Sequence, residues 1–232
     1  MSLIQEKAFM NKALIFMILA ACIISPSLRA ESEPPQMSLD GLELVEKDSR
    51  GEIYADPDVD WSVYTEIQLE SATVAFRKNW QRDQNRPPNV FKVKASDMEK
   101  IKTELSELFN EVFVQELTEK GDYQMAAESG DNVLRISPQI VDLDVYAPDI
   151  PQPGMQRSYT QQAGRMTLKL ELYDSVTGAL IATASDRQED PYRNYLQWTN
   201  SATNRAAARR MLERWATDLR KRLDEARSSS TP

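Results

Sequence analysis

The sequence predicts an α+β fold: an antiparallel-rich sheet of about four strands with two long helices packed on one face. The strands follow from the alternation of apolar and polar residues, which is clearest over 164–186, where a turn at 174–178 joins two strands into a hairpin. The helices follow from apolar residues that repeat every three or four positions over 96–121 and 200–226.

The first thirty residues have the pattern of a secretory signal peptide. Lys7 and Lys12 precede an apolar run over 13–24, and small residues follow the run. A membrane-spanning helix needs about 20 apolar residues, so this run is short for one. The residues that end at Cys22 resemble a lipobox, in which Cys22 is lipidated, whereas ordinary cleavage would fall after Ala30. We therefore expect an exported protein, either periplasmic or anchored in the cell envelope as a lipoprotein by its N-terminal lipid.

Residues 31–60 predict an acidic, flexible leading segment, because ten acidic residues there face only two basic ones. The acidic run over 56–60 begins like a calcium-binding loop. However, Trp61 and Ile67 stand where such a loop needs glycine and glutamate. The run is therefore interpreted as a solvated turn.

A single domain is expected over 61–227, followed by a tail over 228–232. Strand-like alternation occupies 65–76 and 132–146. Because Pro138 lacks an N–H group, it predicts an interrupted ladder of hydrogen bonds along the second of these strands, or a place at the edge of the sheet.

The first long helix is expected to begin at Ser96, because Ser96 and Glu99 have the spacing of a capping box. It is expected to end at Gly121, a natural C-terminal cap. Its apolar stripe is expected to pack on the sheet.

The last helix combines an apolar face with a basic one. Eight basic residues oppose four acidic ones; the basic residues are Arg205, Arg209, Arg210, Arg214, Arg220, Lys221, Arg222 and Arg227. Three interpretations stay open: this face binds anionic lipid headgroups, pairs with the acidic leading segment, or is solvated.

Two irregular segments, 147–163 and 187–199, flank the hairpin and are the most suited to binding. The first is rich in proline, and the second carries an aromatic cluster. The possible contact residues are Arg157, Tyr159, Tyr192, Tyr195 and Trp198.

The composition excludes several chemistries. The chain has no histidine and one cysteine, which excludes Ser-His-Asp and Cys-His catalysis and the usual zinc sites in the folded part. Its seven glycines form no phosphate-binding loop, and its formal charge of −8 gives no electrostatic reason to bind nucleic acid. We therefore predict no catalytic, cofactor-binding or metal-ligating residues, no cofactor, and no enzymatic activity.

The chain resembles the DUF3313 family, a bacterial family of lipoprotein-like chains without an assigned function, from about residue 61 to 226. The residues that carry the resemblance are Trp61-Ser62-Val63-Tyr64-Thr65, Asn132-Val133-Leu134-Arg135-Ile136 and Leu170-Glu171-Leu172-Tyr173-Asp174-Ser175 with Thr177-Gly178. The resemblance implies a location in the cell envelope and supplies no catalytic residues.

These observations favour a non-catalytic envelope protein, a binding or assembly module with an envelope protein as its unknown partner. One alternative is a peripheral binder of anionic lipid that uses the basic last helix. Another is a cell-wall hydrolase that uses paired carboxylates, for which Asp142, Asp144 and Glu171 are the candidates.

Overall fold

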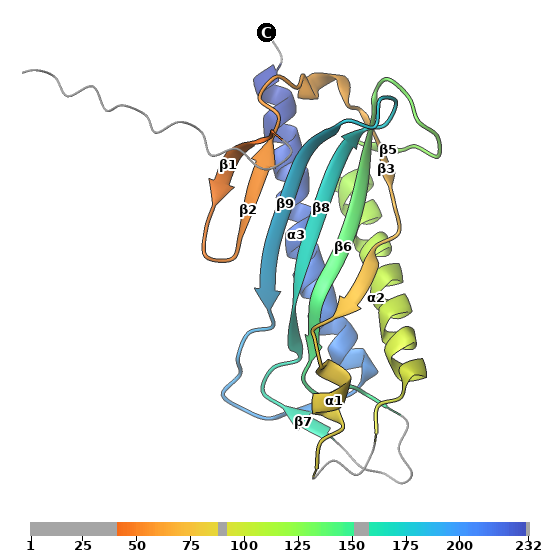
Figure 1. Ribbon diagram of the computed structural model, residues 1–232, viewed down its shortest axis with the longest axis vertical. Helices are drawn as coiled ribbons and strands as arrows, with labels where there is room; N and C mark the ends of the chain where they lie inside the picture. The colour runs from red at the N-terminus through yellow and green to blue at the C-terminus, as the bar shows by residue number, and fades with distance from the viewer. Residues whose placement is uncertain (1–40, 88–91, 151–157, 231–232) are drawn as a thin grey trace, which may run out of the picture. The chain divides into compact units, whose positions relative to one another are not determined.

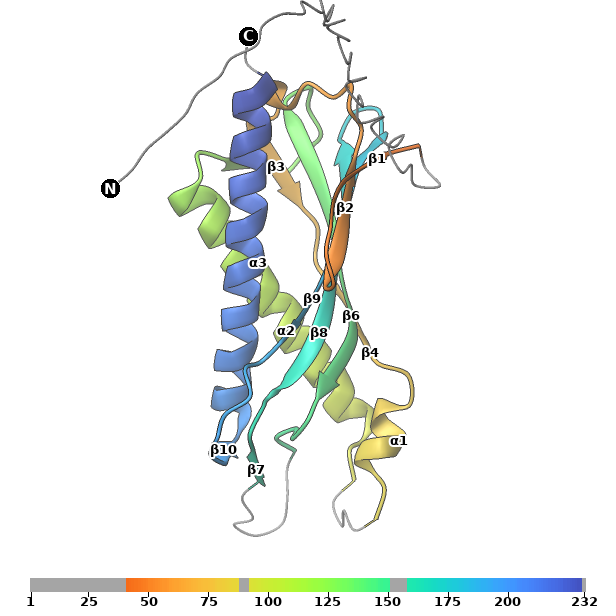
Figure 2. The same ribbon diagram turned by 90° about the vertical axis from the view of Figure 1, so that its left-hand side faces the viewer.

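The described part of the chain has one large sheet, with the two long helices on one of its faces, and a separate two-stranded sheet (Figures 1 and 2). The computed structural model describes residues 41–87, 92–150 and 158–230. The chain divides into Met1–Pro34 and Pro35–Pro232, and every described residue lies in the second unit. The predicted α+β class is confirmed. The proposed signal peptide, with Cys22 and Ala30, lies outside the described residues.

The described strands and helices follow the chain in this order. The strands are β1 (Glu43–Lys47), β2 (Gly51–Ala55), β3 (Glu66–Leu69), β4 (Thr73–Phe76), β5 (Gln124–Met125), β6 (Val133–Val145), β7 (Ser158–Thr160), β8 (Gly164–Asp174), β9 (Leu180–Glu189) and β10 (Gln197–Thr199). The α-helices are α1 (Trp80–Gln84), α2 (Ala95–Gln115) and α3 (Ser201–Ser230). A 3₁₀ turn, Trp61–Val63, precedes β3, and a π-helical turn, Glu116–Lys120, extends α2.

The sheet is larger than predicted, and it is mixed. Eight of the described strands form this sheet in the order β1-β2-β9-β8-β6-β3-β5, with β4 also pairing β6, and β7 and β10 form a separate pair. The prediction of about four antiparallel-rich strands was wrong in number, and it missed that β3 and β4 run parallel to β6. The reason is the connection: the chain leaves β4 and reaches β6 only after α2, and a helical crossover returns the chain in a parallel direction.

The two additional strands at one edge come from the segment that was predicted to be flexible. β1 and β2 form a hairpin, and β2 pairs with β9 in antiparallel register from Gly51↔Asp186 to Ala55↔Ala182. The backbone hydrogen bonds of this pairing do not depend on side-chain polarity, so the acidic composition concealed it. The prediction of an acidic flexible segment over 31–60 is therefore wrong for these two strands.

The hairpin at 164–186 is confirmed as β8 and β9. The Asp174 carboxylate accepts hydrogen bonds from the Val176 and Thr177 N–H groups at 3.2 and 2.7 Å, and Gly178 has a φ of +70°. These are the local bonds and the positive φ that the turn sequence predicted.

Pro138 lies inside the long strand β6 and not at its end or at an outer edge of the sheet. The Glu70 N–H donates to the Ile136 carbonyl at 3.0 Å, so even-numbered residues of β6 direct their backbone groups toward β3 and β4. Paired register with β3 ends at Ile136 and register with β4 begins at Gln139. The missing N–H of Pro138 therefore faces the break between two short strands, where no strand partner is lost.

Near its end, β6 contains a bulge at which Asp142 has a φ of +52°. The bulge turns Leu143 and Asp144 inward together, with exposures of 6% and 4%. Gly164, at the start of β8, passes so close that a Cβ atom would lie 2.2 Å from the Asp144 carbonyl oxygen. Only glycine fits this close approach of the two backbones.

Each long helix differs from its prediction at one terminus, whereas Gly121 is confirmed as the C-terminal cap of the π-helical turn that extends α2. α2 begins at Ala95, and the cap is formed by the Lys94 N–H donating to the Asp97 carboxylate at 2.8 Å, not by Ser96 and Glu99. α3 continues to Ser230, so the predicted tail at 228–232 is helical as far as Ser230. The serine hydroxyls there donate to carbonyls four residues back, so their hydrogen bonds are made within the helix.

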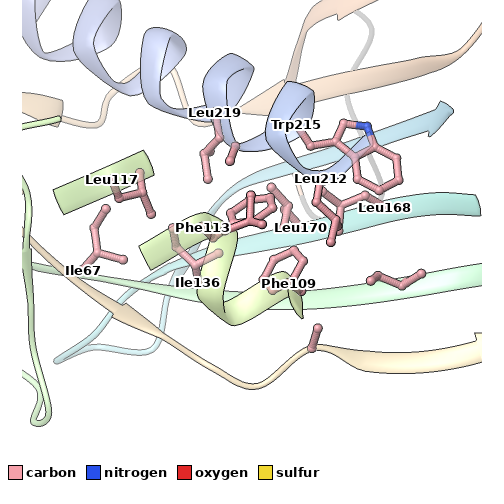
Figure 3. Packing of buried hydrophobic residues seen from close by; sticks show 14 of the residues in the cluster. Ile67, Phe109, Phe113, Leu117, Ile136, Leu168, Leu170, Leu212, Trp215 and Leu219 are labelled. Carbon is pink, nitrogen blue, oxygen red and sulfur yellow. The ribbon is translucent and has the colours of Figure 1, made fainter. Parts of the chain in front are cut away.

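The core lies between the helices and one face of the sheet (Figure 3). Phe109 and Phe113 of α2 stack with their ring centroids 3.9 Å apart, and both are fully buried. Leu212 and Trp215 of α3 and Ile136 of β6 are also buried. Each such side chain contributes roughly 1.5–3 kcal/mol of stabilisation.

Candidate functional site

A cleft of about 520 Å³ lies where α2, α3 and the adjoining ends of β6 and β8 meet. Most of its lining side chains are aliphatic. They come from all four elements and include Ile101, Leu105, Leu108, Leu143, Val145, Met166, Ala202, Ala207, Ala208 and Met211.

The cleft results from the size of the residues along α3. The helix faces the cleft with Ala202, Ala207 and Ala208, and further along it buries Leu212 and Trp215 in the core. Small side chains near the start of the helix leave space that the large ones fill further along. The stripe on α2 lines the opposite wall, and the β6 bulge supplies Leu143 to the floor.

One wall of the cleft carries a buried charge, Asp144, whose side chain is only 6% exposed. Its carboxylate contacts the Arg77 Nε atom at 2.9 Å and the Arg165 Nη2 atom at 3.2 Å. Arg77 also contacts Asp83 at 2.8 Å, and its hydrogen bonds to Asp83 and Asp144 raise the pKa of its guanidinium. Two cations thus balance the buried carboxylate.

A second polar feature of the cleft is Asn204 of α3. Its Nδ2 group donates to the Ala147 carbonyl at 3.0 Å. Its Oδ1 atom is buried and has no hydrogen-bond partner among the described residues. An acceptor in this state is costly unless a bound molecule or water donates to it.

The rim of the cleft is charged, with an excess of acid. Glu104, Glu107 and Asp149 lie on it together with Arg205. Asp149 accepts a hydrogen bond from the Ser201 N–H at 2.9 Å, so this carboxylate caps the start of α3. Arg205 is held by Glu111 of α2 at 2.9 Å.

Comparison with known families identifies the chain. The family model described as "Protein of unknown function (DUF3313)" matches residues 36–219. The chain belongs to the DUF3313 family. The match begins well before residue 61 and so includes the β1–β2 hairpin, which the resemblance drawn from the sequence had left out.

A search of functionally curated proteins gave no match. Among solved structures, a DUF330 protein from Xanthomonas campestris is 12% identical and covers 77% of this DUF3313 chain and 94% of its own, with a TM-score of 0.42. The PelC dodecamer protein from Paraburkholderia phytofirmans is 9% identical over 70% and 95%, with a TM-score of 0.32. A proposed neuraminyllactose-binding hemagglutinin homolog from Helicobacter pylori is 10% identical over 72% and 95%, also at 0.32.

The DUF3313 structure brings part of the predicted contact cluster together, next to the cleft. Tyr159 of β7 and Trp198 of β10 are directly opposite each other in an antiparallel pair. Tyr192 donates to the Gln161 side chain at 2.8 Å, and both Tyr192 and Tyr195 are exposed. Arg157 lies outside the described residues.

Sequence reasoning missed the cleft itself. The available signal was the run of alanines at the start of the last helix, at 202 and 206–208. Further along, the apolar face of the same helix carries large side chains. A helix with small residues toward the core leaves space only if its neighbours do not fill it, and that depends on the packing.

The basic residues of α3 are largely paired with carboxylates. Arg205 and Arg209 contact Glu111, Arg210 contacts Asp190, Arg220 contacts Glu116, and Arg222 contacts Glu46 of β1 at 2.8 Å. The last pair agrees with the interpretation that this helix pairs with the acidic leading segment. The anionic-lipid interpretation stays a prediction.

Glu116 is one of the buried carboxylates among these, with 4% exposure. It accepts hydrogen bonds from Lys120 at 2.7 Å, Thr217 at 3.0 Å and Arg220 at 3.1 Å. Burial alone would raise the pKa of Glu116, but these hydrogen bonds together lower it below its ordinary value.

The carboxylates of the hydrolase alternative are separated by the bulge. Asp142 is exposed, whereas Asp144 is buried against its two arginines. Among the described residues, no cluster of three or more possible metal ligands occurs. In the same part of the chain, no helix has the length and apolar character needed to cross a membrane.

Proposed function

We propose that this DUF3313 protein is a non-catalytic binding module of the cell envelope whose cleft holds one apolar chain of a small ligand. The observation that carries the proposal is the cleft of about 520 Å³ with mostly aliphatic walls. Ligand pockets typically measure about 300–1,000 Å³ and combine apolar walls with a few polar groups. Asn204 is such a group, because its Oδ1 atom is an unused acceptor.

The charges of the lining favour a neutral or cationic head group over an anionic one. Four lining residues are acidic (Glu104, Glu107, Asp144 and Asp149) and two are basic (Arg165 and Arg205), a net charge of −2. A head group with a hydroxyl or amine donor could complete the bonding of Asn204. A neutral single-chain lipid, such as a monoacylglycerol, has both properties.

Several features support a role without catalysis. The chain contains no histidine, and its one cysteine lies in the first thirty residues. Asp144, the buried carboxylate of the cleft, is held by two arginines. Export is supported by the signal-like pattern over 1–30. Mass spectrometry of the mature N-terminus tests the export part, because it distinguishes lipidated Cys22 from a chain that starts after Ala30.

The binding test uses NBD-labelled monoacylglycerol, whose fluorescence rises in an apolar site. Ala202 is exposed and lines the cleft, whereas Ala206 is exposed on the same helix and does not line it. Ala202→Trp should fill the mouth of the cleft and weaken binding at least about tenfold, the effect of losing roughly 60 Å² of apolar contact. Ala206→Trp, the matched control, should bind as the wild type does. Absence of binding to the wild type, or equal binding by both variants, would overturn the proposal.

A further inference from the structure

Five large side chains with exposed apolar surface gather on the β7–β10 pair and the segment before β10. They are Tyr159, Tyr192, Tyr195, Leu196 and Trp198, which we call the aromatic ribbon, and their exposed fractions are 52, 62, 65, 64 and 47%. Tyr159 and Trp198 share one register position of the pair. An apolar cluster of this density on a protein surface marks an interaction site.

The aromatic ribbon carries almost no net charge. Between residues 191 and 198 the only ionisable side chain other than tyrosine is Arg193, which is half-buried. Arg193 faces Asp190 at 4.0 Å, and Asp190 is 2% exposed and also contacts Arg210 at 2.8 Å. Among the described residues, the side chains of the ribbon are therefore aromatic rings and one leucine, and the nearby Arg193 faces a buried carboxylate.

This composition matches the water–lipid interface better than it matches another protein. Tyrosine and tryptophan concentrate at membrane interfaces, because their rings are apolar and their O–H or N–H groups stay hydrated. A stable protein interface buries about 800 Å² on each side and includes a polar, charged rim. The five side chains of the ribbon supply about 450–700 Å² of exposed surface at 150–250 Å² per side chain, which is less than one side of such an interface.

The ribbon also lies beside the mouth of the cleft. A small depression under β7 and β10 is lined by Ala163, Asn204 and Ala207, and the same three residues line the cleft. In Figure 2, β7 and β10 lie at the end of the sheet where α3 begins. The turn between β8 and β9 is at the far end of these two long strands.

We propose that the aromatic ribbon is a membrane-contact surface that inserts into the interfacial layer of a neutral, zwitterionic bilayer. The inference rests on the ribbon alone and stands whether or not the cleft binds a ligand. Because the ribbon is neutral, its binding is independent of anionic lipid and of salt, unlike binding through a basic helix face. Arg193 and Arg210 both contact the one buried carboxylate of Asp190.

The test places an NBD label on the ribbon and a matched one far from it. The full chain with Cys22→Ser has no cysteine, so Asn194→Cys labels an exposed ribbon position and Val176→Cys labels the β8–β9 turn. Val176 is 56% exposed and serves as the control. With phosphatidylcholine vesicles, the label at 194 should shift to shorter wavelength equally in low and high salt, and the label at 176 should not shift.

The apolar segment at 13–24 is present in both labelled chains, so any vesicle binding through it acts on both labels. Adding Tyr192→Ser with Trp198→Ser to the chain labelled at 194 should lower the vesicle affinity reported by that label about tenfold or more. Circular dichroism checks that this variant folds, and if it does not, Tyr195→Ser alone replaces it. No shift at 194, or a shift that requires anionic lipid and disappears in salt, would overturn the proposal. If the label at 194 shifted to shorter wavelength with envelope proteins but not with vesicles, the ribbon would be assigned to a protein partner. That result would also overturn the proposal.

Discussion

Replacing Gly164 by alanine tests the contact that shapes the floor of the cleft. Gly164 has a φ of +154°, and a Cβ atom there would lie 2.2 Å from the Asp144 carbonyl oxygen, a distance that real Cβ atoms do not reach. The neighbour is backbone of the β6 bulge, so it cannot rotate away as a side chain would. A disfavoured backbone conformation costs about 1–3 kcal/mol, and overpacking costs about 1–3 kcal/mol.

We therefore expect Gly164→Ala to lower the free energy of unfolding by about 2–5 kcal/mol, measured by urea denaturation. Gly178→Ala is the matched control. Its φ is +70°, but no atom lies within 4 Å of the added Cβ, so only the backbone cost of about 1–2 kcal/mol applies. The reasoning would be refuted if Gly164→Ala cost no more than Gly178→Ala, because the close approach to Asp144 would then have no energetic consequence.

Three further predictions concern titration and backbone strain. The pKa of Glu116 is lowered from 4.5, so its stabilisation is present above that value and is lost as pH falls; Glu116→Gln should flatten the acid limb of stability against pH. An unchanged acid limb would contradict this. Burial first, and then the hydrogen bond to Asp174, raises the pKa of Tyr64 to about 12, so Tyr64→Phe should remove the last step of an ultraviolet pH titration. A step lost near pH 10 instead would contradict it. Asp142 has a φ of +52°, so Asp142→Gly should be neutral or stabilising by up to about 1 kcal/mol in thermal unfolding, whereas Asp142→Ala should destabilise. If both substitutions changed the stability equally, the claim that the backbone is strained at Asp142 would be refuted.

The elements that were predicted best are those whose structure follows from a local pattern of side chains. The hairpin at 164–186 was predicted because alternation and an Asp-to-Gly turn act locally, and its bonds at Asp174 are those expected. The two long helices followed from their apolar stripes. The strands β1 and β2 were not predicted, because their place at the sheet edge depends on backbone bonds to β9 that leave no apolar pattern.

The parallel strands show a different limit. β3 and β4 are each only four residues long, and their partner β6 is reached through α2. The position of Pro138 makes sense only when both strands are seen beside β6, since its missing N–H falls at the break between them. The sequence of β6 alone therefore predicted only that Pro138 lies at an interrupted hydrogen-bond ladder or at an edge of the sheet.

The candidate site was predictable only in its exposed part. Tyr192, Tyr195 and Trp198 were predicted as contact residues from the aromatic cluster in 187–199, and Tyr159 from the irregular segment 147–163. All four side chains are exposed, and their contact role stays a prediction. The cleft was not predicted, because the walls come from four elements and the space is set by three alanines of α3. Asn204 gave no signal in the sequence, since its unused acceptor appears only after Ala147 has taken its amide group.

The measurement that tests the central claim most directly is nuclear magnetic resonance of carbon-13 methionine methyl groups during titration with unlabelled monoacylglycerol. Met166 and Met211 line the cleft, whereas Met125 lies in β5 and does not. Occupation of the cleft predicts saturable shifts of the Met166 and Met211 signals, an unchanged Met125 signal, and loss of the shifts in Ala202→Trp. Unchanged Met166 and Met211 signals, or shifts equal to that of Met125, would contradict a ligand-binding cleft in this protein.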